Sequence, residues 1–394
     1  MQFCVTIIIT KKVTKKRVCR RRVEIGMSNT KEYKNEMAFH PGYYIAEIIE
    51  EMELSQAEFA ARLGTTGKTL SKLLNGKANI TSDLAKKLSV MMGTSANLWL
   101  NLQNTYDQKL IEIQNEKDFK EQKEIMKQID YKYFVEVAKL PEVRPVEEKI
   151  RHMCDYLKVS DLRIMERPDF LVCFGNNDSG NSKKKEINAR AWIQTAMNVA
   201  KSTDAKPYNA EKLKGFLTEF RSMTMKKPDD FSPRMKNYFA ECGVIFVLLP
   251  YLKNSGINGA VKWASGERAV LAMNSKGLGT DRFWFLLFHE IKHVLQHKTK
   301  TVFIDSTEKE MAENNDPFEI EADRFASNML IPPKKWKRFA PTKDTKDSEI
   351  VEFAESIGIN PMIVAGRLRC EKIIPTGRYS KLKETYEIDF EHYC

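Results

Sequence analysis

The segment FWFLLFHEIKHVLQH, residues 283–297, constrains the fold of this chain more than any other. Its apolar residues run directly into His289, Glu290 and His293. Positions four residues apart lie on one face of a helix, so the two imidazoles project from the same side, as two ligands of one Zn²⁺ must. Glu290 is angled past the metal position, where it can act as a general base. Two interpretations are open: a zinc site, or a buried amphipathic helix with two histidines at its surface.

A zinc site of this kind needs a third protein ligand. His297 follows His293 by four residues, but a straight helix places it about 6 Å further along the axis. That separation is too long to close a tetrahedron whose bonds are about 2.0–2.1 Å. We therefore expect His297 to be a residue at the helix end and not a ligand.

Two acids further along the chain are better placed to complete the site. In FEIEADRFASNMLIP, residues 318–332, Glu319 and Asp323 are four apart and share one helix face. We predict that Glu319 is the third ligand and that Asp323 accepts a hydrogen bond that orients one of the two histidines. Glu321 lies about 200° round the helix from Glu319 and should face elsewhere. The alternative for each acid is a solvated, charged helix face.

A second pattern covers residues 39–110, where apolar residues recur at helical spacing and predict five short helices. Ser55 and Glu58 have the spacing of a capping box, which begins the second helix at 56–63. A glycine ends that helix, and the third helix covers 68–74. Two short helices joined by a glycine turn are typical of a helix-turn-helix.

The third helix carries the small polar and cationic side chains that suit recognition of DNA. Its expected exposed face comprises Thr66, Lys68, Thr69, Ser71 and Lys72, while Leu70, Leu73 and Leu74 should face inward. Gln56, at the start of the preceding helix, and Asn75, just past the third helix, are placed for phosphate contacts. The alternative is a plain helical bundle on which these residues form a solvated face.

The rest of the chain combines helices with a few strands. Residues 107–135 are charged and lack Pro and Gly, which predicts a connecting helix, whereas 243–252 and the pair 259–264 and 268–275 have strand patterns. The expected class is α+β and mainly helical, with a small sheet beside the histidine helix. The predicted divisions are a basic tail at 1–37, a helix-turn-helix domain at 38–110, a helical linker at 111–140 and a second domain at 141–394.

The net charge of +11 is concentrated at the start of the chain. Residues 1–26 contain eight Lys or Arg and one Glu, so they supply +7 and leave +4 for the rest. A short apolar patch precedes the basic run, which is the reverse of the order in a secretory signal. The tail is either an arm that binds phosphates or translated sequence upstream of a native start at Met27 or Met37. We expect it to be disordered in both cases.

The seven cysteines are odd in number, scattered, and form no CxxC pair. This distribution favours free thiols in a reducing compartment. No apolar run approaches the roughly 18–20 residues that a membrane-spanning helix needs. We therefore expect a cytoplasmic protein with no membrane partner.

Residues 40–107 resemble the Xre-type helix-turn-helix of the HigA family of antitoxins. The likeness rests on the opening HPG and on the segments LSQAEFAARLG, LLNGK, ITSDLA and WLNLQNTYD. The resemblance implies an all-α DNA-binding repressor, usually a homodimer on a palindromic operator.

Residues 190–375 resemble the ImmA/IrrE family of zinc metallopeptidases. The likeness rests on HEIKH and EIEADRFASNMLIP, together with the preceding strands ECGVIFVLLP and GAVKWA. It implies a zincin-like domain in which His289, His293 and Glu319 bind Zn²⁺ and Glu290 is the general base. Lys292 departs from the family pattern, which usually has Gly at that position. A cation there would narrow the cleft or point to solvent, so metal binding is a firmer expectation than turnover.

Two functions agree with this pair of modules. The first is a transcriptional repressor whose fused metallopeptidase cleaves or senses a protein partner and so controls repression. The alternative is a non-catalytic antitoxin that binds its operator and a toxin, with the zincin fold as a scaffold. A cleavable partner, or a small toxin gene beside this one, would discriminate between them.

Overall fold

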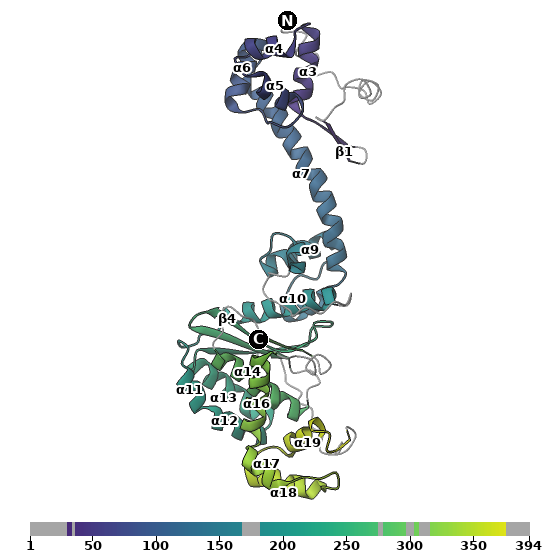
Figure 1. Cartoon of the computed structure of the whole chain (residues 1–394). Helices are drawn as coiled ribbons and strands as arrows, with labels where there is room; N and C mark the ends of the chain where they lie inside the picture. Colours follow the sequence, from purple (N-terminus) through teal and green to yellow (C-terminus); the bar gives the residue numbers. More distant parts are fainter. Residues whose placement is uncertain are drawn as a thin grey trace. The chain divides into compact units, whose positions relative to one another are not determined.

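The computed structural model describes residues 30–33, 36–167, 182–274, 279–296, 303–306 and 316–375 (Figure 1). The chain divides into two compact units, Met1–Glu121 and Gln122–Cys394. The first is dominated by helices, and the second adds a small sheet to a helical framework. This is the α+β, mainly helical class that the sequence predicts. None of the helices in the described part of the chain is both long and apolar enough to cross a membrane.

The helical core of the first unit forms where apolar positions repeat. Its helices are α3 (Pro41–Glu51), α4 (Gln56–Arg62), α5 (Gly67–Leu74), α6 (Ser82–Met92) and α7 (Ala96–Met126). Hydroxyls cap three of these helices, because Ser55, Thr66 and Thr81 each accept a hydrogen bond from a backbone N–H of the first turn. The apolar faces meet in one core that includes Ile45, Phe59 and Leu73. The first four predicted helices are therefore confirmed.

The His-Pro-Gly opening of α3 brings that helix against α5. His40 is the N-cap, and its Nδ1 accepts a hydrogen bond of 3.0 Å from the Gly42 N–H. Pro41 occupies the first turn, where no N–H is needed. A Cβ on Gly42 would lie 2.0 Å from the carbonyl oxygen of Leu73 in α5. Only glycine permits this approach of the two helices.

Two features of the first unit differ from the sequence predictions. Thr30–Tyr33 (β1) and Glu36–Phe39 (β2) pair as an antiparallel hairpin, so the prediction of a disordered tail over 1–37 is wrong for this stretch. The earlier part of that tail, residues 1–29, lies outside the described residues. The predicted fifth helix and connecting helix are one helix, α7, because no Gly or Pro interrupts residues 96–126.

Helices precede the sheet of the second unit. They are α8 (Tyr131–Val137), α9 (Val146–Leu157), η1 (Leu162–Glu166), α10 (Ser182–Ala200), α11 (Ala210–Gly215), α12 (Leu217–Ser222), η2 (Met223–Met225) and α13 (Pro228–Glu241). Three cysteines of this unit, Cys154, Cys242 and Cys370, are free thiols. For these residues the prediction of unpaired cysteines is confirmed.

The sheet comprises β3 (Val244–Leu249), β4 (Ile257–Ser265), β5 (Arg268–Asn274) and β6 (Phe303–Ser306). Its strand order is β3-β5-β4-β6, with β3 parallel to β5 and β4 antiparallel to both of its neighbours. The strands predicted at 259–264 and 268–275 are β4 and β5, which pair as an antiparallel hairpin. Every residue of β3 is buried, as expected for a strand covered on both faces.

Helices cover both faces of this sheet (Figure 1). α10 contacts β3, β4 and β5 on one side, and α14 (Thr280–Gln296) lies against the other with α13 and α16 (Pro317–Leu330). The chain then continues through α17 (Pro333–Phe339), α18 (Asp347–Ile357) and α19 (Pro361–Cys370). The histidine helix is therefore a central element of the second unit.

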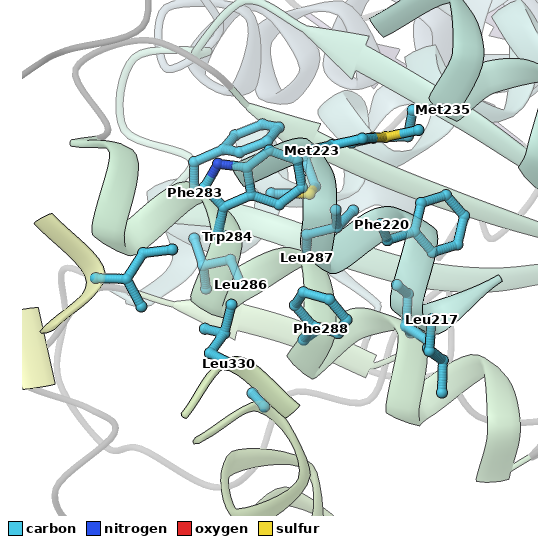
Figure 2. Packing of buried hydrophobic residues seen from close by; sticks show 14 of the residues in the cluster. Leu217, Phe220, Met223, Met235, Phe283, Trp284, Leu286, Leu287, Phe288 and Leu330 are labelled. Carbon is cyan, nitrogen blue, oxygen red and sulfur yellow. The ribbon is translucent and has the colours of Figure 1, made fainter. Parts of the chain in front are cut away.

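The apolar run before the histidines forms the centre of the main core. Phe283, Trp284, Leu286, Leu287 and Phe288 pack with Leu217, Phe220, Met223, Met235 and Leu330 (Figure 2). Alternate residues of three strands, among them Phe246, Val261 and Leu271, belong to the same core. This packing holds α14 beneath the sheet and determines where its polar face can point.

The contact between α3 and α5 predicts an unusual sensitivity at one glycine. Gly42→Ala should destabilise the first unit by about 2 kcal/mol or more, because the new methyl group meets a backbone oxygen that cannot move alone. Gly67→Ala is the matched control, since a Cβ there has no neighbour within 4 Å. Hydrogen exchange on the full chain measures both variants, with the amides of β3–β5 as internal reference. Equal protection of α3 and α5 in the two variants would contradict the prediction.

Candidate functional site

The two histidines of α14 and one carboxylate of α16 meet at a single point. The Nε2 atoms of His289 and His293 are 2.9 Å apart. Glu319 places Oε2 at 3.1 Å from Nε2 of His289 and Oε1 at 3.4 Å from Nε2 of His293. Each histidine side chain is only 1% exposed, so the interpretation of two surface histidines is wrong.

The spacing of these donors fits a small tetrahedral cation. Bonds of about 2.0–2.1 Å in tetrahedral geometry separate neighbouring ligand atoms by roughly 3.3 Å. The three contacts here range from 2.9 to 3.4 Å, and ligand atoms of all three residues lie within 4.8 Å of one another. Two imidazole nitrogens and one carboxylate oxygen are also the donor types found in sites for Zn²⁺. The group thus has the composition and dimensions of a metal site.

Each histidine is oriented through its second ring nitrogen. His289 Nδ1 lies 2.9 Å from Oδ1 of Asp323, and His293 Nδ1 lies 2.9 Å from Oε1 of Gln296. Both acceptors favour a proton on Nδ1, so Nε2 is the ring nitrogen available to a metal beside Glu319. Asp323 therefore lies where the sequence places it, beside a histidine. Gln296 was missed, because a polar residue in the last turn of a helix carries no distinguishing signal.

The buried charges of the site stabilise one another. Burial by itself would lower the pKa of His289, but hydrogen bonds with Asp323 and Glu319 outweigh it and raise the pKa to about 10. Burial would likewise raise the pKa of Glu319, yet hydrogen bonds with the two histidines lower that pKa to about 2. A metal cation that replaced the proton on His289 Nε2 would lie beside the same Glu319 carboxylate.

Glu290 occupies a narrow space between α14 and β4. It is fully buried, and a Cβ on Gly259 would lie 2.4 Å from its Oε1. A side chain at position 259 would therefore push the carboxylate away from the sheet. The sequence analysis did not single out Gly259, although a glycine within a strand often marks such a close approach.

The remaining residues named from the sequence lie around the three donors. Glu321 is outside the group, as predicted, but it contacts α14 through Lys292 and Gln296. Lys292, which departs from the family pattern, forms an ion pair with Glu321 at 3.0 Å. It neither projects freely into solvent nor joins the donors. His297 lies outside the described residues.

The predicted recognition helix is α5, and its faces are arranged as expected. Leu70, Leu73 and Leu74 are buried, whereas Gln56, Thr66, Lys68, Thr69, Lys72 and Asn75 are exposed and Ser71 is half-buried. Thr66 caps the helix by accepting a hydrogen bond from the N–H of Thr69. The amide of Asn75 donates a hydrogen bond of 2.8 Å to the Ser71 carbonyl. Lys68 and Lys72 are thus the exposed cations of this surface.

Each of the two units contains a segment that matches a known protein family. Residues 45–99 match a family model described as a helix-turn-helix, and residues 245–369 match one described as an IrrE N-terminal-like domain, of the peptidase M78 type. The uncharacterized HTH-type transcriptional regulator YddM of Escherichia coli (strain K12) is 46% identical over 72 residues. These residues are 18% of this chain and 77% of that protein. The chain belongs to the family of HTH-type transcriptional regulators.

Solved antitoxin structures resemble the same N-terminal segment of this regulator. An addiction module antidote protein of a HigA family from Coxiella burnetii is 32% identical and covers 21% of this chain and 92% of its own, with a TM-score of 0.20. The antitoxin HigA of Pseudomonas aeruginosa, solved with the higBA promoter, is 29% identical over 21% of this chain and 90% of its own, also with a TM-score of 0.20. Scores this low support no argument about the fold.

The geometry predicts how substitutions change metal binding. His289→Ala or His293→Ala should abolish binding of a divalent ion, and Glu319→Ala should weaken it more than Glu321→Ala, because only Glu319 places oxygen atoms among the imidazole nitrogens. Metal content after desalting, and affinity from competition with a chelator, measure the effect. If Glu321→Ala lost more metal affinity than Glu319→Ala, Glu319 would be the wrong ligand.

Proposed function

We propose that this regulator represses transcription at an operator and that its second unit is a zinc peptidase that cleaves or senses a protein partner to control repression. The observation that carries the proposal is the convergence of His289, His293 and Glu319 beside the buried Glu290. Three protein ligands leave a fourth coordination position open, which is typical of catalytic zinc and not of structural zinc.

The residues of the site have distinct chemical roles in this proposal. A bound Zn²⁺ would polarise the substrate carbonyl and lower the pKa of a water molecule. Glu290 accepts one proton from the water that attacks the peptide carbon and passes it to the amine nitrogen as the C–N bond breaks. Its position against Gly259 keeps the carboxylate in one place throughout. Asp323 holds His289 in the tautomer that the metal requires.

The first unit supplies the DNA-binding half of the proposal. Its exposed α5 surface would direct side chains toward base edges in the major groove, with Thr66, Lys68, Thr69, Ser71 and Lys72 as the contacting residues. Gln56 and Asn75 would contact phosphates at either end of this surface. We propose a homodimer on a palindromic operator, acting in the cytoplasm, where its thiols remain reduced.

A non-catalytic antitoxin remains the second candidate. Two observations favour it: the sequence resemblance of residues 40–107 to HigA antitoxins, and Lys292 at a position where zinc peptidases of this type usually have glycine. In that case the second unit would bind a toxin and the metal would stabilise the scaffold. Zinc binding without cleavage of any partner, together with a toxin encoded beside this gene, would favour the antitoxin.

Binding to the protein's own promoter tests the DNA half. Lys72→Ala should raise the Kd for the promoter roughly 3- to 10-fold, because one phosphate contact is lost. The slope of log Kd against log salt concentration should fall by about one. Thr69→Ala should relax sequence preference. Lys201→Ala removes an exposed charge from the second unit and should leave the Kd unchanged. If the wild-type protein shows no preference for its promoter over random DNA, the repressor proposal fails.

Glu290→Gln tests the peptidase half. The substitution preserves size, so zinc content and operator affinity should match the wild type, while cleavage of the partner falls about 10²-fold or more through loss of the general base. In a reporter strain the variant should repress normally but fail to derepress under inducing conditions. The triple variant Glu290→Gln, Lys68→Ala, Lys72→Ala should behave in the reporter strain like the variant Lys68→Ala, Lys72→Ala, which lacks only DNA binding.

The exposed Glu219→Gln makes the same chemical change on α12 and serves as the control. If Glu290→Gln derepresses as well as the wild type in every condition, proteolysis does not control repression, and the antitoxin becomes the better account.

A further inference from the structure

The amide of Gln296 has a specific partner for each of its polar atoms. Oε1 lies 2.9 Å from Nδ1 of His293, and Nε2 donates to the carbonyl of Phe318 and to Oε2 of Glu321, both at 3.0 Å. Reversing the amide would place its oxygen against two acceptors, so these partners determine its orientation. The oxygen is therefore held as the acceptor for the His293 Nδ1–H.

Glu321 holds that amide and a second group of α14 at the same time. Its Oε2 accepts from Gln296, while its Oε1 lies 3.0 Å from Nζ of Lys292. Lys292 is largely covered, with 20% of its side chain exposed, and its ammonium lies 5.7 Å from the centre of the Phe325 ring. Lys292 and Gln296, on successive turns of α14, therefore both contact the Glu321 carboxylate of α16.

We propose that Lys292, Gln296 and Glu321 form a positioning clamp that prepares the metal site by fixing His293 and by joining the helix of the two histidines to the helix of Glu319. This inference rests on the proposed metal site and extends it to residues outside the ligand group. Asp323 orients His289 directly. The clamp does the same for His293 through an amide that is itself anchored.

The expected contribution of the clamp is to metal affinity and not to folding. Glu321 is 55% exposed, and ion pairs on an exposed surface contribute little to stability. Loss of a group that orients a metal-binding histidine, in contrast, typically weakens metal affinity about 10- to 100-fold. These two quantities can be measured separately on the same variants.

The central experiment compares zinc affinity of the full chain by competition with a chelator. Gln296→Met removes the acceptor for His293 and should raise the zinc Kd about 10- to 100-fold. Lys292→Met acts one contact further away and should raise it only about 2- to 5-fold. The matched control is Gln194→Met, which removes a half-buried glutamine of α10 bonded to Asn198 and should leave the zinc Kd unchanged.

A role reversal distinguishes orientation from general packing. Gln296→Glu combined with Glu321→Gln keeps an acceptor for His293 at position 296 and a donor at position 321, while the Phe318 carbonyl loses its donor. This double variant should therefore bind zinc more tightly than Gln296→Met but less tightly than the wild type, which packing alone would not predict. The thermal midpoint of the metal-free Gln296→Met protein should stay within about 3 °C of the wild type, since Gln296 is only half-buried and its partner Glu321 is exposed.

Three outcomes overturn the clamp. One is an unchanged zinc Kd in Gln296→Met, another is a loss equal to that of Gln194→Met, and the third is a double variant no better than Gln296→Met. A wild-type chain that binds no zinc would overturn the metal site as well, and the wild-type titration alone would reveal it. Zinc binding without peptide cleavage would refute only the proposed peptidase and leave the clamp measurable.

Discussion

The second unit is organised by the burial of polar groups next to an apolar core. α14 carries an apolar run, 283–288, of which only Phe285 is partly exposed, and directly after it two imidazoles and a carboxylate that are buried as well. Polar groups out of water are costly unless hydrogen bonds or opposite charges compensate them. For the two imidazoles, α16 provides that compensation through Glu319 and Asp323. The packing of α14 against α16 therefore also sets the geometry of the site.

The same argument links the sheet to the chemistry of the site. β4 must lie close to α14 to complete the core, and Gly259 is the position at which the strand meets Glu290. A larger residue at this position would displace the carboxylate. The site is therefore held by packing on its apolar side and by hydrogen bonds on its polar side, and neither alone would keep the donors at metal-binding distances.

The first unit depends on a different close contact. Gly42 lets α3 approach the backbone of α5 closely, so α3 packs directly against the recognition helix. The apolar residues of α5 are buried in this packing, and its lysines are exposed at the surface. A transcriptional regulator needs such a rigid presentation, because base contacts are lost when the recognition helix can rotate.

The sequence by itself determined the first four helices of the first unit, the histidine helix, the strands that pair as β4 and β5, the inward leucines of α5 and the spacing of His289 and His293. Each of these depends on neighbours within a few residues. Glu319 and Asp323 were also predictable, since helical periodicity places them on one face. The roles of Gln296, Lys292 and Gly259 became visible only in the tertiary structure. Their function depends on which element lies opposite them, and the packing of α14 against α16 and β4, which local pattern does not encode, decides that.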